Sequence, residues 1–117
     1  MPNIEITTDN IDSLRLEDLR KNIFQLINTH TDLMSMDREQ FLFLIGYFPA
    51  IYNYVSELYT YQIAQVRTFT ELNDRFATAR ARDKRDILEQ ALKSIKLQYE
   101  SLSRKITILI PMEDGRA

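Results

Sequence analysis

Cysteine is absent from this chain, and glycine and proline are scarce. With no cysteine among its 117 residues, the chain can form neither a disulfide framework nor a thiolate metal site, which fits a reducing compartment. Two glycines and three prolines leave few residues that interrupt regular structure. So few interruptions favour long helices over a β fold with many turns, and the sequence therefore predicts an all-α protein.

Long apolar runs and targeting segments are also lacking. Residues 1–9 have neither a basic start nor an apolar core, so no secretory signal is visible. The longest uncharged stretch, residues 40–56, contains Gly46 and Pro49 and is polar in its second half. A membrane span needs about 20 predominantly apolar residues. We therefore expect no membrane association and a cytoplasmic location.

Length and composition indicate one ordinary globular domain over residues 1–117. A chain of this size can bury a core without covalent staples, and 44% hydrophobic with 27% charged residues is typical of folded proteins. The net charge of −2 hides an asymmetry. Residues 1–60 carry nine acidic and four basic side chains, whereas residues 75–105 carry nine basic and four acidic ones. Such a basic segment could meet an anionic partner or the acidic part of another copy.

Two heptad stripes in the second half of the chain are mirror images of each other. The first stripe consists of Val55, Leu58, Gln62, Gln65, Phe69, Leu72 and Phe76. The second stripe consists of Leu88, Leu92, Ile95, Tyr99, Leu102, Ile106 and Leu109. Folding the chain at Arg82 pairs the two stripes one to one, beginning with Phe76 and Leu88. This pattern is typical of an antiparallel helical hairpin.

The sequence therefore predicts a three-helix bundle built around a long, coiled-coil-like antiparallel hairpin. The expected elements are an extended arm over 1–12, helices over 13–30, 37–80 and 84–108, and a disordered tail over 111–117. Gly46 and Pro49 predict a kink or break in the second helix, because proline removes a main-chain donor and clashes with the preceding turn.

Two alternatives to this organisation stay open. Alternation of side chains in residues 3–8 fits a short strand as well as an extended arm. The expected turn, residues 79–83, contains no glycine. A single continuous helix from Pro49 to about Leu109 is therefore the rival to the hairpin, and it would require a partner to cover its stripe.

Aromatic residues gather in the second expected helix, where eight of the twelve lie between residues 41 and 61. They widen the apolar surface to four of seven heptad positions, which is more than a two-helix hairpin covers. Three interpretations fit: packing at the rim of the core, an oligomer interface, or a surface on which bases or another ligand stack. The candidate interface residues are Phe41, Phe43, Tyr47, Tyr52, Tyr54, Tyr59 and Tyr61.

Two glutamines interrupt the first stripe at its middle. Gln65 would face Tyr99 in the mirrored pairing and could hydrogen-bond its hydroxyl. Polar groups at such positions often set register and oligomeric state. The alternative is that Gln62 and Gln65 lie at the solvent edge.

A basic cluster falls at the expected turn. Its members, the candidate residues for anion or nucleic-acid contact, are Arg80, Arg82, Lys84 and Arg85. Lysine and arginine neutralise phosphates and release counterions. Asp74, Asp83 and Asp86 lie among them, however, and the balance of 17 acidic against 15 basic residues is far from that of a dedicated nucleic-acid binder. A solvated helix tip, docking onto an acidic protein surface and nucleic-acid contact all fit this cluster.

No pattern in the sequence points to catalysis, to a metal or to a cofactor. The single histidine, His30, falls in a polar stretch, and no serine lies in a glycine-rich elbow. A Glu-x-x-His pair and a glycine-rich phosphate loop are also missing. Asp83, Asp86 and Glu89 are three residues apart, but basic residues interleave with them, and a capping role in a first helical turn fits them.

We therefore expect a non-enzymatic helical module for protein–protein interaction or assembly. It would act as a homo-oligomer, a dimer or higher, through the tyrosine-rich side of the second helix. The alternative is an accessory protein that binds nucleic acid through the basic cluster. An enzyme with an unrecognised site remains as a residual class.

Overall fold

The fold, seen in a computed structural model, consists of two long α-helices and one short one. The structure describes residues 5–28 and 38–109, except for the side chains of residues 41 and 105–109. In chain order the elements are η1 (a 3₁₀ turn, Ile11–Ser13), α1 (Leu16–Ile27), α2 (Arg38–Glu71) and α3 (Arg75–Leu109). The described residues contain no strand, so the prediction of an all-α protein is confirmed.

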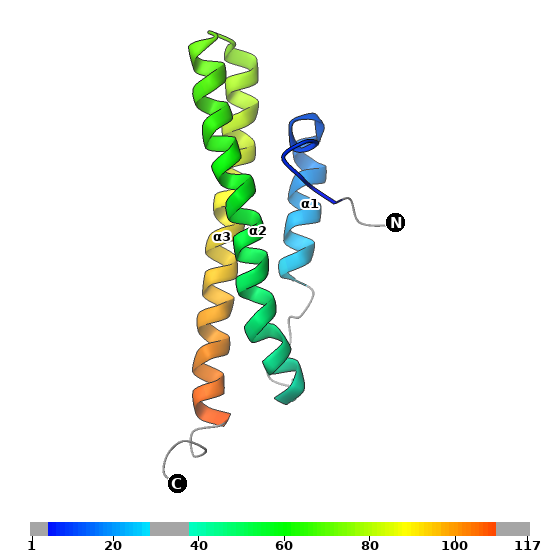
Figure 1. The fold of residues 1–117 in the computed structure, drawn as a ribbon, viewed down its shortest axis with the longest axis vertical. Coiled ribbons are helices and arrows are strands. Elements are labelled where there is room, and N and C mark those ends of the chain that lie inside the picture. The colour runs from blue at the N-terminus through cyan, green and yellow to red at the C-terminus, as the bar shows by residue number, and fades with distance from the viewer. Residues whose placement is uncertain (1–4, 29–37, 110–117) are drawn as a thin grey trace.

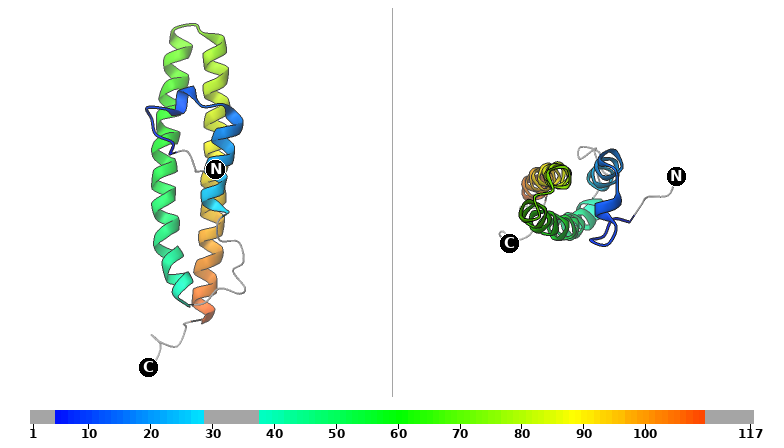
Figure 2. Two further views of the ribbon diagram at one scale, coloured as in Figure 1. Left: turned by 90° about the vertical axis from the view of Figure 1, so that its right-hand side faces the viewer. Right: turned by 90° about the horizontal axis from the view of Figure 1, so that it is seen from above.

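The two long helices run in opposite directions and pack against each other along most of their length (Figures 1 and 2). The buried seam of α2 consists of Leu44, Phe48, Ile51, Val55, Leu58 and Gln62. The buried seam of α3 contains Ala81, Lys84, Leu88, Ala91, Ile95 and Leu102. Both seams advance in steps of mainly three and four residues, which keeps one face of each helix against the other. Two of these seam positions, Gln62 and Lys84, are polar.

A three-residue turn joins the long helices. Asn73 has a φ of 59°, in the left-handed region that asparagine tolerates better than most residues. The main-chain N–H of Asn73 bonds to the carbonyl of Thr70, and that of Asp74 bonds to the carbonyl of Phe69, each at 3.0 Å. These two bonds form a Schellman motif that ends α2. The Asp74 carboxylate then accepts the N–H of Ala77 at 3.0 Å, which caps the start of α3.

The predicted position of the turn is therefore wrong. Residues 79–83 lie inside α3, which begins at Arg75 rather than at residue 84, and α2 ends at Glu71 rather than at residue 80. The mirrored pairing of Phe76 with Leu88 is wrong as well, because both residues belong to α3. Heptad stripes repeat, so several registers align equally well, and the local chemistry of the turn decides among them.

Of the expected kink or break in the second helix, the break is absent, because α2 continues through Gly46 and Pro49, and the kink stays a prediction. Leu44 and Phe48, which precede Pro49, are fully buried, and Ile51, which follows it, is also buried. The apolar seam thus holds the helix against its neighbours on both sides of the proline. The proline itself is exposed, where its missing N–H carries a smaller cost than in the core.

The short helix α1 packs mainly against α3, and the segment before it crosses the hairpin (Figure 2). Leu19, Ile23 and Ile27 are fully buried, each contributing about 1.5–3 kcal/mol. This helix is shorter than the predicted range of 13–30. Before it, residues 5–10 form no strand but a turn that leads into η1. The predicted tail, residues 111–117, lies outside the described residues.

Core truncations test the register of the two long helices. Leu88 is fully buried, whereas Leu72 is 68% exposed although the mirrored pairing placed it in the core. We expect Leu88→Ala to lower the free energy of unfolding by about 2–5 kcal/mol. Leu72→Ala should change it by less than about 0.5 kcal/mol. Urea unfolding followed by circular dichroism measures both, and equal losses would contradict the observed register.

Glycine at position 46 offers a test of helix continuity. A Cβ added to Gly46 would meet no atom within 4 Å, so an alanine fits without strain. Because glycine in a helix interior costs about 0.5–1 kcal/mol relative to alanine, Gly46→Ala should stabilise the protein by that amount. Thermal unfolding provides the measurement, and a destabilised variant would indicate that α2 is interrupted at this point.

Candidate interaction surfaces

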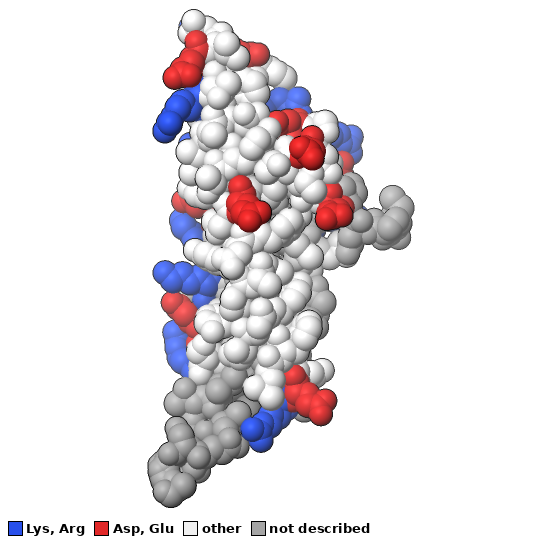
Figure 3. Space-filling model, viewed as in Figure 1, with Lys and Arg blue, Asp and Glu red and all other residues white. Residues whose placement is uncertain are grey.

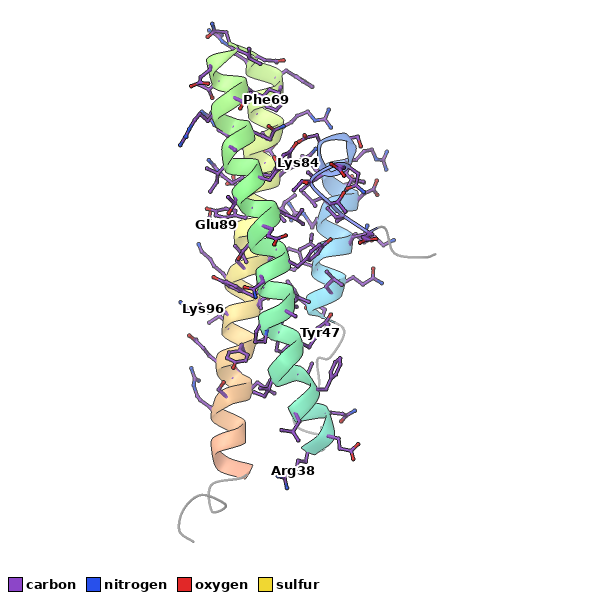
Figure 4. All side chains as sticks on the ribbon, in the orientation of Figure 1. Arg38, Tyr47, Phe69, Lys84, Glu89 and Lys96 are labelled. Carbon is purple, nitrogen blue, oxygen red and sulfur yellow. The ribbon has the colours of Figure 1, made fainter. Side chains whose placement is uncertain are left out.

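A buried lysine links the N-terminal segment to the hairpin. Lys84 lies in the seam of α3 and is 2% exposed, and it reaches toward the segment before α1 (Figure 4). Its Nζ donates to the main-chain carbonyls of Ile11 at 2.7 Å and of Asp12 at 2.9 Å. Burial lowers the pKa of Lys84, the nearby Arg80 lowers it further, and Asp12 opposes both effects. The ammonium group thus anchors η1 without a direct carboxylate partner.

The Asp12 carboxylate accepts hydrogen bonds from three side chains of α2. The Tyr61 hydroxyl and Gln65 Nε2 donate to Oδ2, the latter at 2.9 Å, and Gln62 Nε2 donates to Oδ1 at 3.4 Å. The predicted contact of Gln65 with Tyr99 is therefore wrong. Gln62 is fully buried, and among the described side chains its Oε1 is a buried atom without a hydrogen-bond donor. The two glutamines thus hold the N-terminal segment in place.

Three tyrosines at heptad spacing hold the N-terminal part of the chain in the same way. The hydroxyl of Tyr47 donates to the carbonyl of Leu26 at 2.8 Å, that of Tyr54 donates to the carbonyl of Ile6, and that of Tyr61 donates to Asp12. Burial raises the pKa of Tyr54. These three predicted interface residues are engaged within the molecule, so their side of α2 is already occupied.

Two other predicted interface residues, Phe43 and Phe41, lie near the start of α2. Phe43 is 57% exposed, and its ring stacks on that of Tyr47 with 5.4 Å between centroids. The side chain of Phe41 lies outside the described residues. The surface of α2 seen in Figure 3 has a white stretch between the charged residues at its lower end and the acidic residue over its middle. This agrees with the uncharged stretch of residues 40–56.

The remaining predicted tyrosines lie on the opposite side of α2. With about 100° of rotation per residue, Tyr52 lies about 140° from Tyr47 around the helix axis. Tyr52 also lines a groove of about 310 Å³ between α2 and α3. Further apolar residues of α2, which are exposed or half-buried, follow Tyr52 along this side at helical spacing. They adjoin half-buried apolar residues of α3. We call this surface the Tyr52 face, and its residues are Tyr52, Tyr59, Ile63 and Val66 of α2 with Leu92 and Tyr99 of α3.

The end of the hairpin extends beyond the N-terminal part of the chain (Figure 1). Phe76 is 75% exposed and Leu72 is 68% exposed, and Phe69 is half-buried (Figure 4). Sequence reasoning placed all three in the hairpin core and missed this surface. The signal that could have revealed it is the Asn73–Asp74 pair, because asparagine favours the left-handed conformation and aspartate caps helices.

The four basic candidates do not form a tip. The turn lies at residues 72–74, so Arg80 to Arg85 lie inside α3. Lys84 is buried, and Arg85 forms an ion pair with Asp86 at 3.1 Å. Arg80 and Arg82 are exposed. The expectation of an exposed basic tip that contains Lys84 is therefore wrong, whereas contact of the cluster with an anion or a nucleic acid stays a prediction.

The other titratable candidates do not gather into a site. Asp83 and Asp86 are exposed within α3 rather than in its first turn, and Glu89 lies 3.4 Å from Lys93. The described residues bring no group of three His, Cys, Asp or Glu together in a way that could hold a metal ion. His30 lies outside these residues. No helix in residues 5–28 or 38–109 combines the length and apolar character needed to cross a bilayer.

Comparisons with family models, with curated proteins and with solved structures found no match for this chain.

The hydrogen bond from Tyr61 predicts a dependence of stability on pH. The bond to Asp12, with burial and two nearby carboxylates, raises the pKa of Tyr61 to about 12, whereas an unfolded tyrosine titrates near 10. Its contribution is therefore complete below about pH 10 and is lost as the pH rises toward 12. The difference in unfolding free energy between the parent and Tyr61→Phe should shrink from about pH 8 to about pH 11. A difference that stays constant in urea unfolding would contradict this bond.

Proposed function

We propose that this protein is a non-enzymatic helical assembly module that forms a homo-oligomer through the Tyr52 face. The observation that carries the proposal is the row of apolar side chains on the side of the hairpin that α1 does not cover. Tyr52 is 38% exposed and Ile63 is 40% exposed. Aromatic and aliphatic residues in one continuous row are typical of the buried centre of interfaces.

The spacing along α2 supports a helical partner. Tyr52, Tyr59, Ile63 and Val66 follow one another at intervals of seven, four and three residues. These intervals place them on one face of the helix, next to the seam that packs against α3. In a coiled-coil-like antiparallel hairpin, such a second stripe is the place where a further helix adds to the bundle.

The charges beside the Tyr52 face favour a second copy of this chain as the occupant. In a two-fold symmetric dimer the same patch of both copies forms the interface, and the two copies of each helix run in opposite directions across it. A pairing centred near Leu92 brings Glu89 of one copy against Lys96 of the other, and both lie on the side of α3 away from α1 (Figure 4). Within its own helix Glu89 forms an ion pair with Lys93. Because this pair is exposed, it contributes little stability, and Glu89 can exchange it for Lys96 of the other copy.

Introducing charge on this face tests the proposal. We expect the parent to show at least twice the monomer mass by light scattering after size exclusion, at both low and half-molar salt. The double variant Tyr52→Glu with Ile63→Glu should be a folded monomer, because it places unpaired charges in the centre of the interface. Salt should affect the parent only slightly, since apolar burial is not screened.

A matched control distinguishes the face from a general effect of charge. Thr60→Glu with Ala64→Glu adds the same charge at exposed positions that lie off the Tyr52 face, and it should keep the mass of the parent. A parent that is monomeric over the accessible concentration range would refute the proposal. So would equal dissociation of the control variant.

A further inference from the structure

A small cavity opens at the end of the hairpin, beside η1. It has a volume of about 130 Å³, and its walls include Asp12, Phe69, Phe76, Ala77, Arg80 and Lys84. It belongs to a different part of the surface from the Tyr52 face, because no residue of that face lines it. The cavity combines two cations with two aromatic rings.

The two cations lie close together on the same side of α3, one helical turn apart. Lys84 uses two of its three N–H donors on main-chain carbonyls. Arg80 makes no ion pair or hydrogen bond with any residue in the described part of the chain. The carboxylate that lines the cavity, that of Asp12, already accepts three side chains of α2. The guanidinium of Arg80, which is exposed, therefore keeps its hydrogen-bonding capacity for an anionic group.

The walls around these cations are apolar and open to solvent. Phe76 is 75% exposed, and Phe69 and Ala77 are half-buried. An aromatic ring left exposed beside an unpaired guanidinium is typical of surfaces that bind a partner carrying both an apolar and an acidic group.

We propose that this cavity binds an acidic, apolar segment of another protein, with a glutamate or aspartate carboxylate on the exposed Arg80, next to the buried positive charge of Lys84. An adjacent aromatic or aliphatic side chain of the partner packs on Phe76 and Phe69. Arginine binds a carboxylate with two parallel N–H groups, so the guanidinium of Arg80 sets the orientation of the partner. The segment approaches along the open end of the hairpin.

The surroundings favour a protein carboxylate over the phosphates of a nucleic acid. A nucleic acid requires a continuous track of cations along its backbone. The cavity itself is lined by the Asp12 carboxylate beside the two cations, and farther along α3 Arg85 is paired with Asp86. Two cations framed by carboxylates and phenyl rings suit one carboxylate with an apolar neighbour.

Fluorescence anisotropy with a short labelled peptide, in which glutamate alternates with phenylalanine, tests the proposal. Two matched peptides carry glutamine in place of glutamate or serine in place of phenylalanine, and single-stranded DNA carries the same label. We expect only the first peptide to bind the parent. Its affinity should fall about tenfold in Arg80→Gln, which removes a charged hydrogen bond, and also fall in Phe76→Ala.

Both substitutions change exposed side chains, so they leave the core intact, unlike a change at Lys84. Arg82→Gln is the matched control, because it removes the same charge from an exposed position of α3 that does not line the cavity. This variant should bind the peptide as tightly as the parent does.

Several outcomes would overturn the proposal. They are equal binding of the glutamine peptide, equal losses in Arg80→Gln and Arg82→Gln, and preferential binding of the DNA. Dissociation of the parent oligomer by Arg80→Gln would identify a second copy as the occupant and would refute a separate partner. The double variant Tyr52→Glu with Ile63→Glu should still bind the peptide, so that failure of the assembly proposal and failure of this one are distinguishable.

Discussion

The main-chain conformation of Asn73 determines which residues of α2 and α3 face each other. Both helices are continuous on either side of the turn, so their relative register is set where the chain reverses and is carried along the whole hairpin. This register places the polar seam residues Gln62 and Lys84 close enough to the N-terminal segment to hold it. It also leaves Leu72 and Phe76 beyond the reach of α1. Both proposed interaction surfaces therefore depend on a turn of three residues.

The sequence predicted the helices well and their connection poorly. Scarce glycine and proline and the heptad spacing of apolar residues are properties of long stretches, and they correctly indicate long helices. The turn depends on two residues, Asn73 and Asp74, whose effect is local. The heptad spacing of apolar residues continues through the turn, so the spacing alone does not reveal where the turn lies. Pro49 shows the opposite case, because tertiary packing of Phe48 and Ile51 overrides a strong local preference.

The candidate sites were predictable in kind but not in detail. Composition correctly located aromatic side chains on α2, yet the acceptors of the Tyr47 and Tyr54 hydroxyls lie 21 and 48 residues away and are set by the docking of the N-terminal segment. Lys84 looked like one member of a basic cluster. Its place four residues before Leu88 put it on the seam, where a side chain is withdrawn from solvent and bonds to the main chain instead.

The bond between Lys84 and η1 has a consequence for the order in which the molecule folds. The carbonyl of Ile11 lies 73 residues from Lys84 in sequence, whereas the turn joins α2 and α3 within three residues. Contacts that close small loops form early, and those that close large loops form late. We expect the hairpin to form first with its polar layer still hydrated. Docking of the N-terminal segment then removes water from Lys84 and completes the native state.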